Sequence, residues 1–183
     1  HDDFVAALAE YARDNAKVGM PDDEDALLGP VNNSTQLAHV TGMLERLPQH
    51  ASIATGGNRV SSLGDGFFLS PAVVAGLNQD DEVIQNEIFG PVICIRRFGT
   101  EAEAIALANQ GDFGLVATVV GRDRVAANRV ADALQAGMVW INAPQVIFPQ
   151  TAWGGYKQSS IGRELGPWGL AAFQELKHVV SAG

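Results

Sequence analysis

Cysteine, basic residues and long apolar runs are all scarce in this 183-residue chain. Cys94 is the only cysteine, which excludes an intramolecular disulfide and agrees with a reducing compartment, so we expect a cytoplasmic protein. Lys and Arg number 12 against 21 Asp and Glu, and the net charge of −9 argues against a nucleic-acid partner. No apolar run approaches the roughly 18 residues of a membrane span, and no signal-peptide pattern opens the chain, so we expect no membrane association.

The residues that are present indicate a globular α/β protein. Apolar residues make up 46% of the chain and charged residues 18%. In the first half, hydrophobic spacing predicts helices over 3–16 and 34–47 (the second capped by Asn33 or Ser34) and extended segments over 53–55 and 67–77.

In the second half, the pattern alternates between strand and helix. It predicts strands over 92–98, 115–120 and 138–142, helices that begin after Thr100 and Asp123, a last helix, and an extended stretch over 178–181. The run 115–120 is continuously apolar, as expected for a strand buried on both faces. Such alternation is typical of a parallel α/β sheet, and we expect one domain.

Several generic sites are excluded. The four histidines have no metal-ligand spacing with one another or with Cys94. Neither a G-x-G-x-x-G pattern after a strand nor a Walker loop is present. Cys94 lies between apolar neighbours in a predicted strand, so we expect an inert, buried thiol.

Two stretches have the residues for chemistry. In Glu87–Pro91, Glu87 and Phe89 stand two apart on an extended loop, so both side chains point to one side. A carboxylate there suits the two hydroxyls of a ribose, and a ring suits a flat heterocycle. The alternative is a capped turn with a core phenylalanine.

The second stretch is Trp153–Gly166, which is dense in glycine. Glycines let a backbone approach a ligand or an ion closely. Arg163 and Glu164 are expected at the start of the last helix, where a carboxylate is favoured. The alternative is a tight structural corner.

Together these stretches closely resemble the aldehyde dehydrogenase superfamily. The matching motifs are E-I-F-G-P at Glu87–Pro91 and G-G-x-K-x-S-x-x-G-R-E-x-G at Gly154–Gly166. Between them, 109–115 looks like the family's N-x-x-x-[YF]-G-L turn, and 138–142 looks like its strand V-[WY]-[IV]-N. The resemblance covers essentially the whole chain, and 148–155 with 162–169 look most like betaine aldehyde and aminoaldehyde dehydrogenases.

The resemblance implies a parallel-sheet, three-layer catalytic domain. Residues 1–183 would be a partial domain, truncated at its N-terminal side, with the nucleotide-binding domain and the catalytic cysteine upstream of His1. The chain alone is then expected to be inactive. Two alternatives stay open, namely a fragment cut from a longer enzyme and a noncatalytic homologue that acts as an interaction module.

The resemblance also implies a mechanism and a substrate class. A cysteine thiolate attacks the aldehyde, hydride passes to NAD or NADP, and water activated by a glutamate base releases the carboxylic acid. The substrate is a small-molecule aldehyde, and the whole enzyme is expected to be a homodimer or homotetramer. NAD and NADP are not distinguished, because the residues that read the ribose 2′ position lie upstream.

Residue by residue, the resemblance assigns Glu87 to the cofactor ribose and Phe89 to the nicotinamide. Glu164 resembles a relay behind the base. Trp153, Ile147 and Gln145 are implied at the aldehyde tunnel, where the Trp153 ring either attracts a quaternary ammonium or is only an apolar wall. The carbonyls of Lys157 and Ser160 match a site for a monovalent cation (K+), provided that Ser160, usually glycine in the family, does not need a positive φ.

Overall fold

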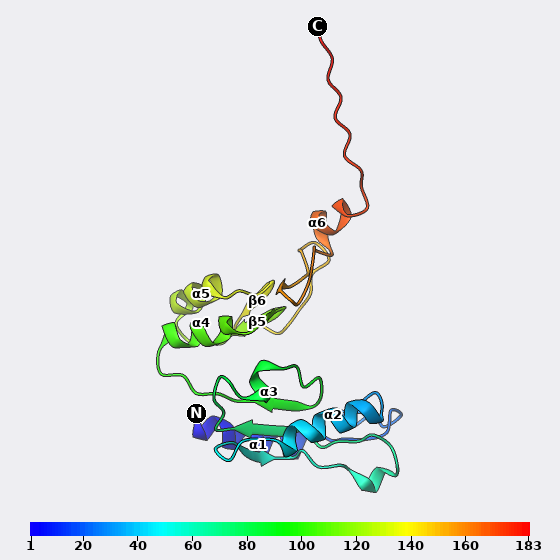
Figure 1. Ribbon diagram of the computed structural model, residues 1–183, viewed down its shortest axis with the longest axis vertical. Helices are drawn as coiled ribbons and strands as arrows, with labels where there is room; N and C mark the ends of the chain where they lie inside the picture. Colours follow the sequence, from blue (N-terminus) through cyan, green and yellow to red (C-terminus); the bar gives the residue numbers. More distant parts are fainter. The chain divides into compact units, whose positions relative to one another are not determined.

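A computed structural model describes all residues from His1 to Gly183, and the chain divides into two compact units. Unit 1 is His1–Arg97 and unit 2 is Phe98–Gly183. The sequence predicts one domain, and that both units belong to a single catalytic domain stays a prediction. Figure 1 labels the α-helices of both units and the strands β5 and β6 of unit 2.

Unit 1 is built around a three-stranded sheet in the order β1-β2-β3. Its elements are α1 (Asp2–Asn15), α2 (Ser34–Glu45), β1 (Ser52–Thr55), η1 (Ser61–Leu63), β2 (Ala72–Ala75), α3 (Glu82–Gln85) and β3 (Val92–Cys94). β1 pairs with β2 antiparallel, whereas β2 pairs with β3 in parallel. The sheet is therefore mixed, where the sequence predicts a parallel one.

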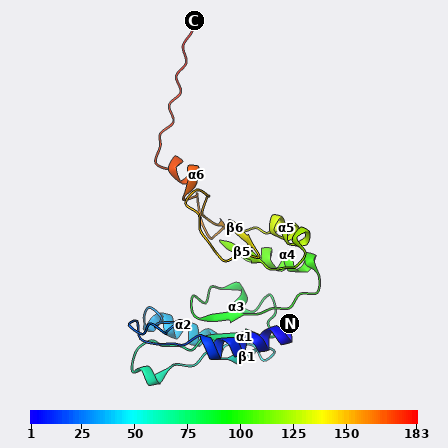
Figure 2. The same ribbon diagram turned by 180° about the vertical axis from the view of Figure 1, so that it is seen from behind.

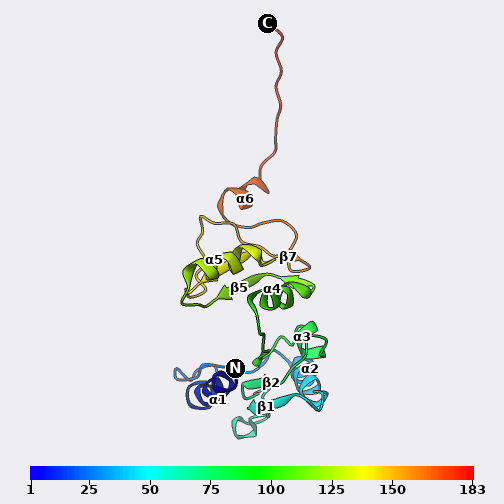
Figure 3. The same cartoon turned by 90° about the vertical axis from the view of Figure 1, so that its left-hand side faces the viewer.

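The central strand β2 explains how unit 1 holds together. All four of its residues are buried, including Val73 and Val74, which point to opposite faces. Ala72 and Val74 pack with Val40 of α2 in the core cluster, while α1 contacts β1 and β2. Figures 2 and 3 show α1 and α2 on opposite sides of the strands. Helices thus cover both faces of this small sheet.

Unit 2 is built around a parallel strand pair. Its elements are α4 (Glu101–Gln110), β4 (Phe113–Gly114), β5 (Val116–Val119), α5 (Arg124–Ala133), β6 (Met138–Ile141), β7 (Tyr156–Lys157) and α6 (Gly166–Ala171). β5 and β6 pair in parallel from Val116↔Met138 to Val119↔Ile141, and α5 connects them and contacts both. β4 pairs with β7 antiparallel.

The predicted helix starts are confirmed by their hydrogen bonds. The Asn33 side chain accepts from the amide of Gln36 at 2.8 Å, and Asp123 accepts from the amides of Val125 and Ala126. Thr100 accepts from the amide of Glu103 at 3.2 Å. These bonds satisfy backbone donors that a helix leaves free at its N-terminus.

The strand predicted over 115–120 is present as β5, but its predicted burial is wrong, and so is the extended stretch predicted over 178–181. The run 115–120 is not buried on both faces, since β5 alternates between exposed and half-buried residues and Val120 is 82% exposed. The physical reason is that α5 supplies the main helical contacts to both β5 and β6, and alternate residues of β5 stay exposed. Residues 178–181 form no strand, because no neighbouring strand pairs with them.

Candidate functional site

The Glu87–Phe89 segment presents alternating side chains in unit 1. Ile88 is buried, at 8% exposure, whereas Glu87 is exposed and Phe89 is 80% exposed. Phe89 also has a φ of +51°, which is uncommon for any residue other than glycine. The alternative of a core phenylalanine is therefore wrong, and an exposed carboxylate and an exposed ring flank one buried anchor.

Helix α2 holds this segment by its backbone. Gln36 donates from Nε2 to the carbonyls of Ile88 at 3.0 Å and Phe89 at 2.7 Å, and His39 Nε2 lies 3.2 Å from the carbonyl of Glu87. Neither Gln36 nor His39 belongs to one of the two motifs of the sequence. Both contacts join positions about fifty residues apart, so no local pattern signals them.

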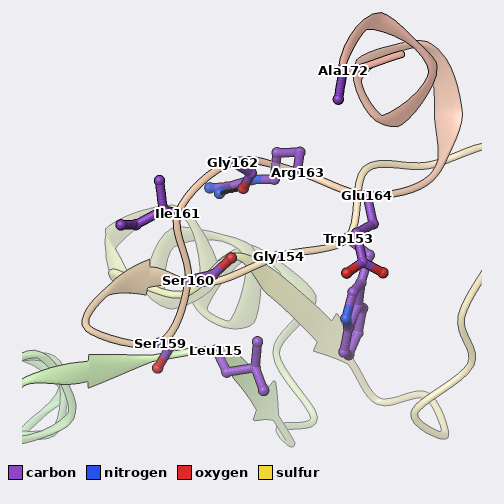
Figure 4. Close-up of a pocket in the computed structure, with 10 residues that line it drawn as sticks. All are labelled: Leu115, Trp153, Gly154, Ser159, Ser160, Ile161, Gly162, Arg163, Glu164 and Ala172. Carbon is purple, nitrogen blue, oxygen red and sulfur yellow. Dashed lines mark hydrogen bonds between the residues drawn. The ribbon is translucent and has the colours of Figure 1, made fainter.

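Trp153 and Glu164 are brought together in unit 2. They form an antiparallel bridge in which each amide donates to the other's carbonyl, at 2.8 Å and 2.7 Å. Directly opposed residues of an antiparallel pair project to the same face. Figure 4 shows the carboxylate beside the indole. The prediction that Glu164 lies at a helix start is close, since α6 begins at Gly166.

A cavity of about 340 Å³ lies against this pair. Its lining comes from Leu115, from Trp153 and Gly154, from the run Ser159–Glu164, and from Ala172 (Figure 4). An indole, a carboxylate and a guanidinium thus share one small cavity within unit 2. Such a mixture of apolar wall and a few polar groups is typical of a small-molecule site.

Arg163 shapes the loop that closes the cavity. Its Nη1 donates to the carbonyls of Gly155 at 3.0 Å and Gly162 at 2.6 Å, and its guanidinium carbon lies 5.6 Å from the Tyr156 ring centroid. The side chain therefore ties the two ends of the loop 155–162 together. The sequence predicts Arg163 only at the start of the last helix and gives no signal of this role.

Lys157 and Ser160 occupy that loop in different ways. The Lys157 ammonium donates to the carbonyls of Asn109 and Gly111 at the end of α4, so its side chain is not available to the cavity. Its backbone has a φ of +54°. Ser160 lines the cavity and is not among the residues with positive φ, so replacing the family's usual glycine leaves its backbone unstrained.

Gln145 and Ile147 do not line this cavity. The Gln145 amide lies 3.4 Å from the Thr118 hydroxyl, and Ile147 is 48% exposed. Between them, the Val146 carbonyl accepts a hydrogen bond at 2.9 Å from the indole of Trp140, whose ring lies 6.5 Å from that of Trp153. Val146, which lies between them, is thus linked to Trp153 through Trp140, whereas Gln145 and Ile147 themselves are not among the residues that line the cavity.

Cys94 lies half-buried in β3 of unit 1. Burial raises the pKa of its thiol to about 11, which opposes formation of the nucleophilic thiolate. No three His, Cys, Asp or Glu side chains gather where they would hold a metal ion. None of the helices has the length and apolar character needed to cross a membrane.

These features are those of an aldehyde dehydrogenase. The model of the aldehyde dehydrogenase family matches residues 1–179, and the chain belongs to that family, whose relatives are NAD(P)-dependent oxidoreductases. Among its relatives, a chloroplastic aminoaldehyde dehydrogenase of Arabidopsis thaliana is 37% identical over 178 residues, and peroxisomal aminoaldehyde dehydrogenase 2 of Pisum sativum is 40% identical over the same length.

A solved structure agrees with these relatives. Betaine aldehyde dehydrogenase of Staphylococcus aureus in complex with NAD+ is 39% identical, with a TM-score of 0.89 over 94% of this chain. The chain covers 97% of its own length in the plant relatives but only 35% of theirs, and likewise 35% of the bacterial structure. It therefore spans about a third of the length of the enzymes it matches.

Proposed function

We propose that this chain supplies the cofactor-contacting and aldehyde-lining segments of an NAD(P)-dependent aldehyde dehydrogenase that oxidises betaine aldehyde or an aminoaldehyde. The observation that carries this proposal is the Trp153–Glu164 pair. These residues lie eleven positions apart, have separate roles by family resemblance, and meet at one cavity of about 340 Å³. The names of the relatives and of the NAD+-bound structure support the same substrate and cofactor classes.

The residues of unit 1 fit a nicotinamide cofactor. The exposed Glu87 carboxylate offers two acceptor oxygens to a ribose diol, and the exposed Phe89 ring offers a flat apolar face. When bound, NAD(P)+ supplies the electron acceptor for the oxidation. Glu87 and Phe89 orient it, and their alignment affects the rate because misplacement raises the barrier directly.

The residues of unit 2 line the aldehyde site and transfer protons. Trp153 walls the aldehyde site, with Ile147 and Gln145 beside it, and Glu164 moves protons behind the general base. The nucleophilic cysteine and that base lie outside these 183 residues, so the chain by itself is inactive. By the same resemblance, the carbonyls of Lys157 and Ser160 bind K+, and the unstrained backbone of Ser160 is compatible with this.

We propose that the enzyme to which these residues contribute is a homodimer or homotetramer located in the cytoplasm. The relatives named as chloroplastic and peroxisomal show that other members act in organelles.

The substrate class is tested by Trp153→Leu in the complete enzyme. Leucine keeps apolar bulk but removes the π face, so the loss for betaine aldehyde isolates an attraction of roughly 0.5–2 kcal/mol, or about 2- to 30-fold in kcat/KM. An uncharged aldehyde of similar size should lose little, because leucine still excludes water. Equal losses for both substrates would show that Trp153 is only a wall.

A further inference from the structure

A second cavity, of about 270 Å³, lies in unit 1 beside the end of α1. Its walls come from α1 and the residues that follow it, from the end of β1, and from residues 60, 70 and 71. None of these residues belongs to the motifs at Glu87–Pro91 or Gly154–Gly166. The lining therefore shares no residue with the segments proposed to contact the cofactor and the aldehyde.

The charged side chains of this lining are Arg13 and Lys17, and both are cations, although the chain carries a net charge of −9. Lys17 is already paired with Asp23, whose carboxylate oxygen lies 2.9 Å from the ammonium nitrogen. Arg13 stands in the last turn of α1, and no hydrogen bond or ion pair engages its guanidinium. Arg13 is therefore a cation that remains available to a ligand.

The rest of the lining combines an apolar wall with two hydroxyl groups. Ser70 is engaged, because its Oγ donates to the Asn58 carbonyl at 3.1 Å and accepts from the Asn58 amide at 3.0 Å. Thr55 is half-buried at the end of β1, and its hydroxyl has no hydrogen-bond partner within the chain. The apolar wall is formed by Ala12, Ala16, Val18, Val60 and Pro71. One free cation and one free hydroxyl donor thus border an apolar surface.

Size and chemistry together restrict what this cavity can hold. Its volume is slightly below the roughly 300–1,000 Å³ of sites for drug-sized ligands, so the ligand is small. An inorganic anion would leave the apolar wall in water, and an uncharged apolar molecule would leave the guanidinium unpaired. A carboxylate on a short alkyl chain satisfies both, because a guanidinium matches the two oxygens of a carboxylate in a bidentate pair.

We propose that this cavity binds the carboxylate of a small aliphatic acid. The Arg13 guanidinium is the main anion contact, the Thr55 hydroxyl donates a further hydrogen bond, and the alkyl chain packs against Ala16 and Val60. The C-terminus of α1 carries about half a negative charge, which the full positive charge of Arg13 outweighs. The proposal goes beyond the oxidation of aldehydes and does not depend on the roles proposed for the two motifs.

Binding is tested by adding acetate, butyrate, butyramide or inorganic phosphate to the isotope-labelled 183-residue chain and following its amide resonances. Butyrate should shift the amides of residues 12–18 and 55–56 in a saturable manner. It should bind about 3- to 15-fold more tightly than acetate, because its two further methylenes are partly buried. Butyramide has the same shape without the charge and should bind at least about tenfold more weakly than butyrate. Equal binding of butyrate and any other probe would overturn the ligand class, and a lack of saturable shifts at these amides would overturn the site.

Variants of Arg13 separate a specific contact from an effect of net charge. Arg13→Gln should weaken butyrate binding about 5- to 20-fold, and Arg13→Lys, which keeps the charge but loses the bidentate geometry, should fall between this variant and the wild type. Arg122→Gln makes the same charge change at an exposed arginine of unit 2 and is the matched control. Equal weakening by Arg13→Gln and Arg122→Gln would overturn the proposal.

Hydrogen exchange of the β2 amides shows whether the variants keep the fold of unit 1, and we expect unchanged protection because Arg13 is exposed. None of these measurements uses dehydrogenase activity. A negative result would therefore remove the carboxylate site and leave the proposed function standing.

Discussion

The two units of the chain are held together by different interactions. All but two of the buried apolar residues lie in unit 1, and the exceptions in unit 2 are Ala127 and Trp140. Unit 2 relies on the βαβ pair and on polar contacts such as the Arg129–Glu101 ion pair, with both hydrogen bonds at 2.7 Å. Apolar burial dominates in unit 1, and directional bonding dominates in unit 2.

The difference decides how each candidate segment is placed. In unit 1, a core side chain, Ile88, anchors the loop, and hydrogen bonds only orient it. In unit 2, the loop backbone itself makes the contacts, and Gly137 lies so near Gly154 that a Cβ would stand 1.6 Å from the Gly154 carbonyl oxygen. Hydrogen bonds specify geometry but each adds only about 0.5–1.5 kcal/mol. Unit 2 should therefore be well defined in its loops but only weakly stabilised.

The largest effect is expected for a core truncation in unit 1. Leu69 is 1% exposed within the main cluster, so Leu69→Ala should lower the free energy of unfolding by about 2–5 kcal/mol. Leu170→Ala in unit 2, where the side chain is 58% exposed, should change it by less than about 0.5 kcal/mol. Hydrogen exchange of the β2 and β6 amides measures both. Similar losses in the two variants would remove the distinction between the units.

The second effect concerns thiol reactivity. Burial raises the pKa of Cys94 to about 11, so the fraction of this thiol that is ionised at pH 8 is small. The reference is a cysteine introduced by Ile161→Cys, at a fully exposed position of unit 2. Iodoacetamide should modify Cys94 about 100-fold more slowly than this reference cysteine. The Cys94 rate should rise about tenfold per pH unit up to its pKa. Mass spectrometry of the two peptides gives both rates.

The raised pKa of Cys94 leads us to predict that the chain alone is inactive. No aldehyde-dependent NADH should form when the purified chain is mixed with NAD+ and betaine aldehyde. Activity that Cys94→Ala abolishes would contradict both the inert thiol and the missing nucleophile.

A smaller effect is expected for the bonds that organise unit 2. Lys157→Met keeps the length of the side chain but removes its donors to the carbonyls of Asn109 and Gly111. Because the ammonium is exposed, the free energy of unfolding should fall by only about 1 kcal/mol. Faster amide exchange in the last turn of α4 reports the loss. Lys177→Met, in the exposed tail, is the control, and an equal effect there would show that charge alone matters.

The smallest effect depends on pH and belongs to unit 1. A hydrogen bond with His50 lowers the pKa of Asp81 below its usual value of 3.8, and burial opposes this. A carboxyl group whose pKa is lower in the folded state stabilises the fold at pH values above its unfolded-state pKa. This stabilisation is lost as the pH falls through the folded-state pKa. Asp81→Asn should thus lower the free energy of unfolding of unit 1 at pH 6. The difference in this free energy between the variant and the wild type should become smaller below about pH 4. Urea titrations at the two pH values measure this difference, with Asp80→Asn, at an exposed neighbour, as the control variant.

The local structure and the family follow from short stretches of the amino-acid sequence. Helix starts at Asn33, Thr100 and Asp123 follow from side chains that cap within three residues, so the signal is contained in a short window. The motifs at Glu87–Pro91 and Gly154–Gly166 identified the aldehyde dehydrogenase family for the same reason, since each is a continuous stretch.

The contacts that position those stretches, and the burial of the strands around them, depend on the tertiary structure. Trp153 pairs with Glu164, and Gln36 donates hydrogen bonds to the carbonyls of residues 88 and 89. These contacts join positions that are distant in the sequence, so no local pattern encodes them. The same reason explains the wrong prediction for 115–120. An apolar run shows that a strand can be buried, but burial on both faces requires a second covering layer. In unit 2, α5 makes the main helical contacts to β5 and β6, and alternate residues of β5 stay exposed.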